Sequence, residues 1–398
     1  MTRPTRPDGG GRSAAPVVLH YGRFLTANAR HGGTRRSQQL REILERSGVQ
    51  VVGVALESES RRTPLARAWG VARGAVVSPL GEMLSVRRPA GLYHRAMADL
   101  SLRSSPPGPP VVWEGGPGES FYGGWAARRN GHRVVAAPQN LDSLTPGMAS
   151  AWTGRQSPDW FKEELNELRY ADAIFVLSAN DRWLLSLHDL HADVLPYHPP
   201  ADIEEHLLDL RRDRSARSHA GTSVLALGTM GSEPTARGFR DLLRMLERDS
   251  IMRSTAESIV IAGYGTERMR TAFERTGARV VGTVSEEDLH ALQLDARALL
   301  VHYVPTPGAL TRIPEALIAG IPVIANRHAA RGYEAIPGVH VYDSPEELRE
   351  LLATDLPAPA AMPRPAVEDQ FVSRVLGNDR LDGALPAERP IGARTRVN

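Results

Sequence analysis

Short apolar runs alternate along the chain with longer segments whose apolar residues are spaced for a helix. The runs end at Gly, Pro or polar residues and show little polar alternation, which is typical of strands buried on both faces of a parallel sheet. Between them, Phe239, Leu242, Leu243 and Leu246 recur at helical spacing. The alternation predicts an α/β fold. The runs expected to form strands are 17–21, 49–56, 111–114, 134–137, 171–178, 194–197, 224–228, 259–263, 280–284, 299–304 and 321–325.

The strand pattern occurs twice, on either side of a Pro-Pro pair at 199–200. A chain of 398 residues is long enough for two domains with cores of their own. We predict two Rossmann-like domains, an N-terminal one over 16–200 and a C-terminal one over 201–356. Residues 1–15 are expected to be a disordered tail, and 357–398 a linker, a terminal helix at 367–376 and a second tail.

Composition places the chain among globular proteins. Apolar residues make up 41% and charged residues 24%, and the chain contains no cysteine, which excludes disulfides, thiolate metal ligands and cysteine nucleophiles. No apolar run approaches the roughly 20 residues of a membrane span. The polar N-terminus lacks the apolar segment of a secretory signal. We therefore predict a cytoplasmic protein.

The charge balance does not indicate a nucleic-acid partner. Lys162 is the only lysine among 48 basic residues, and the net charge is only +2. We interpret the arginine excess as a compositional bias, because no zinc-finger spacing or RNA-binding signature accompanies it.

The stretch from 299 to 333 carries the clearest chemistry. It predicts a buried strand, a Pro/Gly loop at 305–310, a short helix at 311–319 and a second buried strand. In an open parallel sheet such loops lie at the carboxyl ends of strands, where ligands bind. Gly308 allows a ligand to approach the backbone, and Arg312 adds a positive charge beside the first amides of the helix.

Glu315 has two interpretations. A carboxylate in the first turn of a helix complements the helix dipole. Alternatively, it accepts hydrogen bonds from a sugar diol while the preceding loop holds phosphates. From the residues alone, both remain open.

The run "TPGALTRIPEALIAGIPVIAN", followed by "ARG", resembles the donor-binding segment of GT-B glycosyltransferases, in particular family 4. The resemblance implies two Rossmann-like domains facing across a cleft. It also implies that Glu315 binds the ribose of a nucleotide sugar, and that Gly308, Ala309, Leu310 and Arg312 bind its diphosphate. Pro307 stands where many members carry a further glutamate.

The same resemblance covers other loops. It implies that the Gly-Gly loop ending at Gly33 faces the cleft. It places Arg237 in a first phosphate loop and the Gly282–Val284 turn beside the nucleobase. The additional donor-binding residues that we predict are Gly33, Arg237, Gly263, Gly265, Thr283 and Val284.

For catalysis, we select Gln139, Asn140 and His31 as candidates. Family members often carry a histidine at the position of Gln139, near the transferred sugar. Glutamine can hydrogen-bond a sugar hydroxyl but cannot act as a general base. This departure puts a catalytic histidine at that site in doubt.

The predicted activity is glycosyl transfer from a nucleotide-diphosphate sugar, a co-substrate rather than a cofactor, to an acceptor hydroxyl. No Asp-x-Asp occurs, and His188 and His191 lack a nearby third ligand, so we predict a metal-independent enzyme. The resemblance favours retention of the anomeric configuration.

One alternative is a GT-B sugar-nucleotide epimerase, with acid/base candidates Glu114, Glu119, Asp142 and His31. Another is a catalytically silent homologue acting as a binding or scaffold subunit.

The acceptor is left open between a lipid-linked molecule and a small natural product. Residues 61–104 hold eight arginines against Glu82 and Asp99. One interpretation is a solvated helical face. The other is a surface that touches an anionic membrane from the cytoplasmic side.

Overall fold

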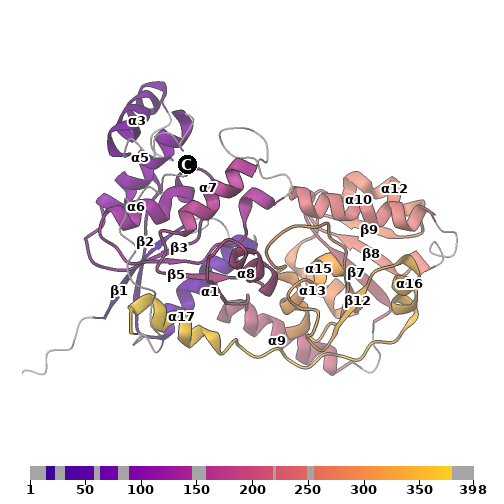
Figure 1. Ribbon diagram of the computed structural model, residues 1–398. Coiled ribbons are helices and arrows are strands. Elements are labelled where there is room, and N and C mark those ends of the chain that lie inside the picture. Colours follow the sequence, from indigo (N-terminus) through magenta and orange to yellow (C-terminus); the bar gives the residue numbers. More distant parts are fainter. Residues whose placement is uncertain are drawn as a thin grey trace, which may run out of the picture.

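The computed structural model describes residues 15–22, 32–57, 63–78, 89–145, 158–217, 221–248 and 255–378. Figure 1 shows two domains, each built on a parallel six-stranded sheet. This confirms the predicted fold class. The N-terminal sheet has the order β2-β1-β3-β4-β5-β6 and consists of β1 (Val17–Tyr21), β2 (Gln50–Gly53), β3 (Val111–Trp113), β4 (Val134–Ala136), β5 (Ala173–Val176) and β6 (Asp193–Val194).

The C-terminal sheet has the order β12-β11-β10-β7-β8-β9. All of its strand pairs are parallel. Its strands are β7 (Ser223–Leu227), β8 (Ile259–Ala262), β9 (Arg279–Gly282), β10 (Ala296–Val301), β11 (Val323–Asn326) and β12 (Val339–Tyr342). The strand order reverses between β7 and β10, which is the position at which ligands bind in open α/β sheets.

Helices cover both faces of each sheet (Figure 1). The N-terminal domain contributes α1 (Gly32–Arg46), α3 (Pro64–Val77), α5 (Pro89–Arg103), η1 (Gly118–Tyr122), α6 (Gly123–Arg129), η2 (Asp142–Leu144), α7 (Pro158–Leu168) and α8 (Ala179–Ser186). The C-terminal domain contributes α9 (Ala201–Ser215), α10 (Glu233–Arg248), η3 (Thr266–Met269), α12 (Arg270–Glu274), α13 (Glu286–Asp295), α14 (Arg312–Ile318), α15 (Arg327–Ala330) and α16 (Pro345–Ala353).

The apolar runs form strands because both of their faces are buried. On β1, Leu19 and Tyr21 pack into one hydrophobic cluster while Val18 packs into another on the opposite face. On β7, Leu225 packs into one hydrophobic cluster and Val224 into another on the opposite face. Alternate side chains of a strand point to opposite faces, so a continuous apolar run is what a sheet with two covered faces requires.

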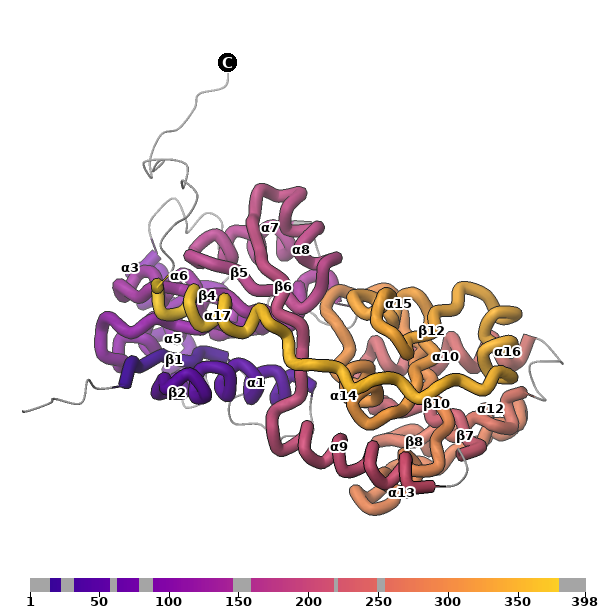
Figure 2. The backbone as a smooth tube through the Cα atoms, turned by 90° about the horizontal axis from the view of Figure 1, so that it is seen from below, coloured from indigo at the N-terminus to yellow at the C-terminus, as the bar shows by residue number. Residues whose placement is uncertain are grey.

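The last helix, α17 (Val367–Leu376), returns to the N-terminal domain. Figure 2 shows residues 355–366 crossing beneath both domains to reach it. Phe371 is fully buried and packs edge-to-face on Phe175 of β5, with ring centroids 5.1 Å apart. Arg133 Nε also donates to the carbonyl of Arg374 at 3.1 Å. The C-terminal segment therefore completes the core of the first domain.

The chain passes between the domains twice, and an ion-pair network joins the two crossings. Arg364 on the returning segment contacts Glu42 of α1 and Glu204 of α9. His198, on the first crossing, contacts Glu204 at 2.9 Å. The side chains of both crossings are thereby tied to each other and to one helix of each domain.

The arginine-rich segment forms a pair of helices, α3 and α5, at the far end of the N-terminal domain (Figure 1). Asp99 is fully buried and pairs with Arg73, Arg103 and Arg129. These arginines thus have an internal counter-charge. None of the helices in the described ranges is long and apolar enough to cross a membrane.

We expect Phe371→Ala to lower the free energy of unfolding by about 3–5 kcal/mol, because it leaves a cavity between α17 and β5. Denaturant unfolding followed by circular dichroism measures this. Leu208→Ala, which truncates an exposed leucine of α9, serves as the control and should change stability by less than about 1 kcal/mol. Equal effects of the two substitutions would contradict the structural role of α17.

Candidate functional site

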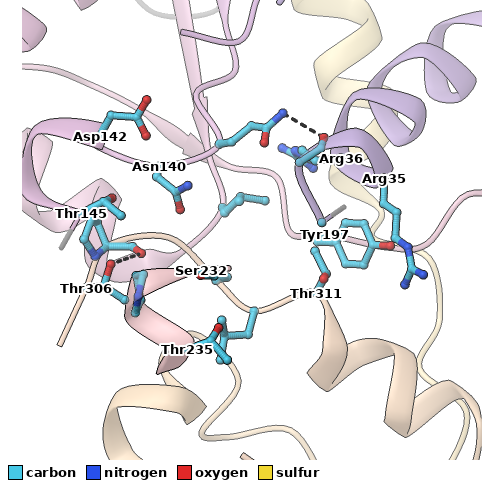
Figure 3. A pocket seen from close by; sticks show the side chains of 18 of the residues that line it. Arg35, Arg36, Asn140, Asp142, Thr145, Tyr197, Ser232, Thr235, Thr306 and Thr311 are labelled. Carbon is cyan, nitrogen blue, oxygen red and sulfur yellow. Dashed lines mark hydrogen bonds between the residues drawn. The ribbon is translucent and has the colours of Figure 1, made fainter. Parts of the chain in front are cut away.

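A cleft of about 740 Å³ lies between the domains, where the carboxyl ends of the strands of both sheets meet. Figure 3 shows side chains from both domains converging on it. The N-terminal domain supplies Gly32, Gly33, Arg35, Arg36, Glu114, Gly115, Gly116, Pro117, Gln139, Asn140, Asp142, Thr145, Leu177 and Tyr197. The C-terminal domain supplies Thr229, Gly231, Ser232, Glu233, Pro234, Thr235, Tyr264, Tyr303, Thr306, Pro307, Ala309, Leu310, Thr311, Arg312 and Glu315.

The loop between β10 and α14 is fixed by both domains. The Gly308 N–H donates to the Asp181 carboxylate of α8, with distances of 3.2 and 3.3 Å to its oxygens. Arg331 donates to the carbonyls of Gly308 and Pro307, at 2.8 and 3.1 Å. Gly308 has φ +81°, and a Cβ there would collide with Asn140 Oδ1. Only glycine satisfies both the backbone conformation and this close approach.

Glu315, in the first turn of α14, contacts the opposite domain. Its Oε2 accepts from Arg35 Nη1 at 2.5 Å, and its Oε1 accepts from the Tyr197 hydroxyl at 2.8 Å. Burial, the Glu315 charge and this hydrogen bond all raise the pKa of Tyr197, so the hydroxyl remains a donor. The carboxylate is thus held in one orientation at the wall of the cleft.

Arg312 lies where β7, α10 and α14 meet. Its guanidinium donates to the Leu227 carbonyl and, at 3.5 Å, to Thr235 Oγ1. Burial lowers the pKa of Arg312. The ordinary pKa of an arginine is so high that the side chain stays charged. A positive charge therefore lies beside the loop that we predict to hold phosphates.

The other predicted donor residues fall into two groups. Gly33, Ala309 and Leu310 line the cleft, whereas Gly308 lies directly behind its surface. Arg237 does not line it, because its side chain turns to Glu233 on the exposed face of α10, with Nε to Oε1 at 2.8 Å. Its predicted phosphate contact stays a prediction.

Gly263, Gly265, Thr283 and Val284 are not among the residues that line the cleft, although Tyr264, between the two glycines, does line it. The Gly265 N–H donates to Thr283 Oγ1 at 3.3 Å. This contact joins the turn after β8 to the turn after β9.

Among the catalytic candidates, Gln139 and Asn140 line the cleft, while His31 lies outside the described residues.

Sequence reasoning did not assign a role at this site to Arg35, Tyr197 or Asp181. Each approaches its partner only through the tertiary fold, and Arg35 is 280 positions from Glu315. Glu114 was considered only as an epimerase acid or base. Its place in the sequence was the available signal. A carboxylate that directly follows a buried strand lies at the carboxyl end of that strand, where ligands bind.

Glu114 lies at the centre of a buried polar network at the floor of the cleft. Its Oε2 accepts from Ser37 Oγ at 2.7 Å and from Gln139 Nε2 at 2.5 Å, and its Oε1 is in ion-pair contact with His20. Burial raises the pKa of Glu114, but the His20 ring and these hydrogen bonds outweigh it, so that the pKa lies below its usual value. Glu114 is therefore ionised at neutral pH.

The other two carboxylates considered from sequence differ in position. Asp142 lines the cleft, whereas Glu119 lies behind it and accepts from Ser101 Oγ and from Tyr21 and the Glu57 N–H. In the described part of the chain, no three His, Asp or Glu side chains gather as a group able to hold a metal ion.

A further carboxyl, Glu164 of α7, lies directly beneath Asp142. It accepts from the Asp142 N–H at 2.8 Å and from Ser143 Oγ at 2.5 Å. Burial raises the pKa of Glu164 to about 8, and the Asp142 charge adds to the rise. The native state therefore binds a proton that the unfolded chain releases near pH 4.5, the ordinary value of this carboxyl.

We expect the free energy of unfolding to fall as the pH rises from about 4.5 to about 8, by at most about 1.4 kcal/mol per pH unit from this group. Glu164→Gln, which cannot titrate, should remove this part of the decline and gain stability relative to the wild type as the pH rises. Denaturant titrations across that range measure it, with the exposed Glu346→Gln as the control. A constant difference between wild type and Glu164→Gln would show that the pKa is not raised.

No protein-family model matches the chain, and no curated protein matches its sequence. Solved structures do resemble it. Sucrose-phosphate synthase from Thermosynechococcus elongatus aligns over 91% of this chain and 94% of its own, with 15% identity and a TM-score of 0.55. The α,α-trehalose 6-phosphate synthase of Burkholderia multivorans aligns over 92% and 96%, with 12% identity and a TM-score of 0.54.

An E. coli trehalose-6-phosphate structure bound with UDP-2-fluoro glucose aligns over 92% of this chain and 96% of its own, with 13% identity and a TM-score of 0.54. At such identities the likeness shows the fold alone. Together with two parallel sheets that face each other across a cleft, it shows that the chain has the GT-B fold.

Proposed function

We propose that this protein is a glycosyltransferase that moves a sugar from a nucleotide-diphosphate sugar to an acceptor hydroxyl, without a metal and with retention of the anomeric configuration. The observation that carries the proposal is Glu315, whose carboxylate stands at the wall of the interdomain cleft beside the Gly308 loop and Arg312. The E. coli neighbour was bound with UDP-2-fluoro glucose and an Anabaena neighbour was in complex with UDP, which supports a nucleotide sugar as the ligand class.

Glu315 keeps the capacity to bind a ribose. A carboxylate has about four lone-pair sites on its two oxygens, and Arg35 and Tyr197 each use one. The remaining sites suit the two hydroxyls of a ribose diol. In this proposal Arg35 and Tyr197 orient the carboxylate and do not block it.

The diphosphate would lie against residues 309–311, whose N–H groups precede the first turn of α14. Arg312 supplies the positive charge that stabilises the leaving diphosphate. Metal independence rests on the sequence, in which no Asp-x-Asp occurs. Retention rests on the family resemblance, together with Gln139, which cannot take a proton from the acceptor.

The acceptor side lies on the N-terminal domain, and its chemistry stays open between a lipid-linked and a small soluble molecule. Membrane contact through 61–104 also stays a prediction. Leu65, Trp69 and Val76 of α3 are exposed, which supports it. The pairing of Arg73 and Arg103 with Asp99 reduces the positive charge that could attract an anionic surface.

A donor panel tests the proposed function. Purified protein is incubated with UDP-, GDP- and ADP-sugars, with and without a mixture of hydroxyl acceptors, and released nucleotide is measured. We expect release that depends on the acceptor and persists in EDTA. Isomerised donor without an acceptor would indicate an epimerase, and nucleotide binding without turnover a silent homologue. Loss of activity in EDTA that only Mg²⁺ or Mn²⁺ restores would contradict metal independence.

Glu315→Ala should weaken binding of the preferred nucleotide by about 10- to 150-fold, because a charged hydrogen bond contributes roughly 1.5–3 kcal/mol. Calorimetry with the nucleotide alone measures this. Tyr197→Phe removes only one hydrogen bond to Glu315 and should change the affinity far less. If Glu315→Ala binds the nucleotide as tightly as the wild type, Glu315 is not the ribose ligand.

A further inference from the structure

One peptide group of the loop between β10 and α14 is held at both ends by charged side chains. It joins Pro307 to Gly308. Its C=O accepts from Arg331 Nη2 at 3.1 Å, and its N–H donates to the Asp181 carboxylate, with distances of 3.2 and 3.3 Å to the two oxygens. The N–H and the C=O of a trans peptide point in opposite directions, so the guanidinium and the carboxylate lie on opposite sides of this group.

These two side chains permit only one orientation of the peptide. A rotation by half a turn would place its C=O against the Asp181 carboxylate and its N–H against the Arg331 guanidinium. An ionised carboxylate only accepts hydrogen bonds and a guanidinium only donates them, so the rotated peptide would lose both bonds. Arg331 belongs to the same domain as the loop, whereas Asp181 lies on α8 of the other domain.

The orientation of this peptide determines which backbone groups face the cleft. Gly308 follows it with φ +81°, a left-handed conformation that turns the chain. The next residues, 309–311, line the cleft, whereas Gly308 lies behind its surface with its N–H turned to Asp181. The amides that a diphosphate can reach are therefore those that follow Gly308.

The contact of Asp181 with Gly308 is not a by-product of helix capping. Asp181 belongs to a capping box at the start of α8, in which Ser178 Oγ accepts from the Asp181 N–H at 3.1 Å and donates to Asp181 Oδ2 at 2.8 Å. α13 begins with the same box, formed by Ser285 and Asp288, with distances of 3.1 and 2.7 Å. Asp288 is exposed, so this box does not require a buried carboxylate.

Asp181, in contrast, is buried, and its partners from the other domain compensate for that burial. Burial raises the pKa of Asp181, while the hydrogen bonds from Ser178 and Gly308 and the charge of Arg331 act in the opposite direction. A buried carboxylate needs such partners in place of the water that it loses. Gly308 and Arg331 both belong to the C-terminal domain, so the burial of Asp181 depends on the contact between the domains.

We infer that Asp181 is a positioning residue for the diphosphate of the nucleotide, although it does not line the cleft and does not belong to the domain that carries the loop. It acts through the Gly308 peptide, whose orientation presents the amides of residues 309–311. The inference rests on the proposed function. It adds that the N-terminal domain determines part of the affinity for the diphosphate and none of the affinity for the nucleoside.

The experiment compares affinities for two ligands. The first is whichever of UDP, GDP and ADP binds the wild type most tightly in calorimetry, and the second is its nucleoside, followed by ligand-detected NMR. We expect Asp181→Ala to bind the diphosphate about tenfold more weakly, on the scale of one hydrogen bond to a charged group, and to bind the nucleoside as the wild type does. Asp181→Asn should bind both like the wild type, because its amide oxygen still accepts from the Gly308 N–H.

Glu347→Ala is the control for the loss of a capping box. Ser344 Oγ accepts from the Glu347 N–H at 3.1 Å at the start of α16, and Glu347 is exposed and does not line the cleft. This variant should bind both ligands as the wild type does. Glu315→Ala should weaken both, because the nucleoside contains the ribose. If Asp181→Ala does not fold, Asp181→Leu, which has a branched side chain of similar shape and cannot accept, replaces it.

The outcomes separate this inference from the proposed function. If the variant without an acceptor at 181 binds the diphosphate as tightly as the wild type, or binds the nucleoside equally weakened, the positioning role is overturned and the proposed function stands. Weakened diphosphate binding in Asp181→Asn would also overturn it, because the charge and not the hydrogen bond would then be responsible. If the wild type binds none of UDP, GDP and ADP, the proposed function fails, and this inference fails with it.

Discussion

The docking of the Gly308 loop onto the N-terminal domain is the contact on which the cleft depends. The loop belongs to the C-terminal sheet, yet its Gly308 N–H is bound by Asp181 and its backbone lies against Asn140, both from the other domain. Immediately after the loop, Glu315 is bound by Arg35 and Tyr197. A side chain at 308 would have to displace the Asn140 side chain and would strain a backbone at φ +81°. The glycine therefore permits the close approach of the two walls of the site.

These contacts are polar and only partly buried, which limits their strength. The side chains of Arg35 and Glu315 keep 27% and 14% of their exposure, and a pair of this kind contributes about 1 kcal/mol or less. The apolar cores lie within the domains and not between them. The ion pairs of Arg364 with Glu42 and Glu204 join the two crossings of the chain between the domains.

The pattern of apolar residues predicted the strands, because each strand depends on the burial of its own side chains. Continuous apolar runs became strands, although the run at 49–56 forms only the short strand Gln50–Gly53. Gly33, Gln139, Asn140, Arg312 and Glu315 all line the cleft, since each follows the carboxyl end of a strand. The partners of these residues could not be predicted. Asp181 binds Gly308 although the two residues are 127 positions apart in the sequence. The spacing of apolar residues carries no information about contacts between such distant positions.

Charge illustrates the same limit. The eight arginines of 61–104 suggested an anionic partner, but Asp99 at the centre of the helix pair binds Arg73 and Arg103. Similarly, Arg237, which we predict to contact a phosphate, pairs with Glu233 on the exposed face of α10. A sequence shows how many charges a segment holds. Whether they remain available depends on the few acidic residues that the fold brings to them.

The cleft itself holds both signs of charge, and their pairing decides where a diphosphate can bind. Arg35 is paired with Glu315, and the Glu114 carboxylate contacts the His20 ring. Among the described residues that line the cleft, Arg36 and Arg312 have recorded hydrogen bonds to carbonyl, amide and hydroxyl oxygens rather than to carboxylates. Arg36 is a residue of α1 and is almost fully buried, and burial lowers its pKa to about 10.

Arg312 is therefore the arginine better placed to meet a substrate. It lies next to the loop that Asp181 and Arg331 hold in place, so the positive charge and the backbone donors are fixed relative to each other before a ligand arrives. Groups arranged in advance around a leaving diphosphate need no reorganisation when its charge develops. That preorganisation explains why so many side chains are used to position one short loop.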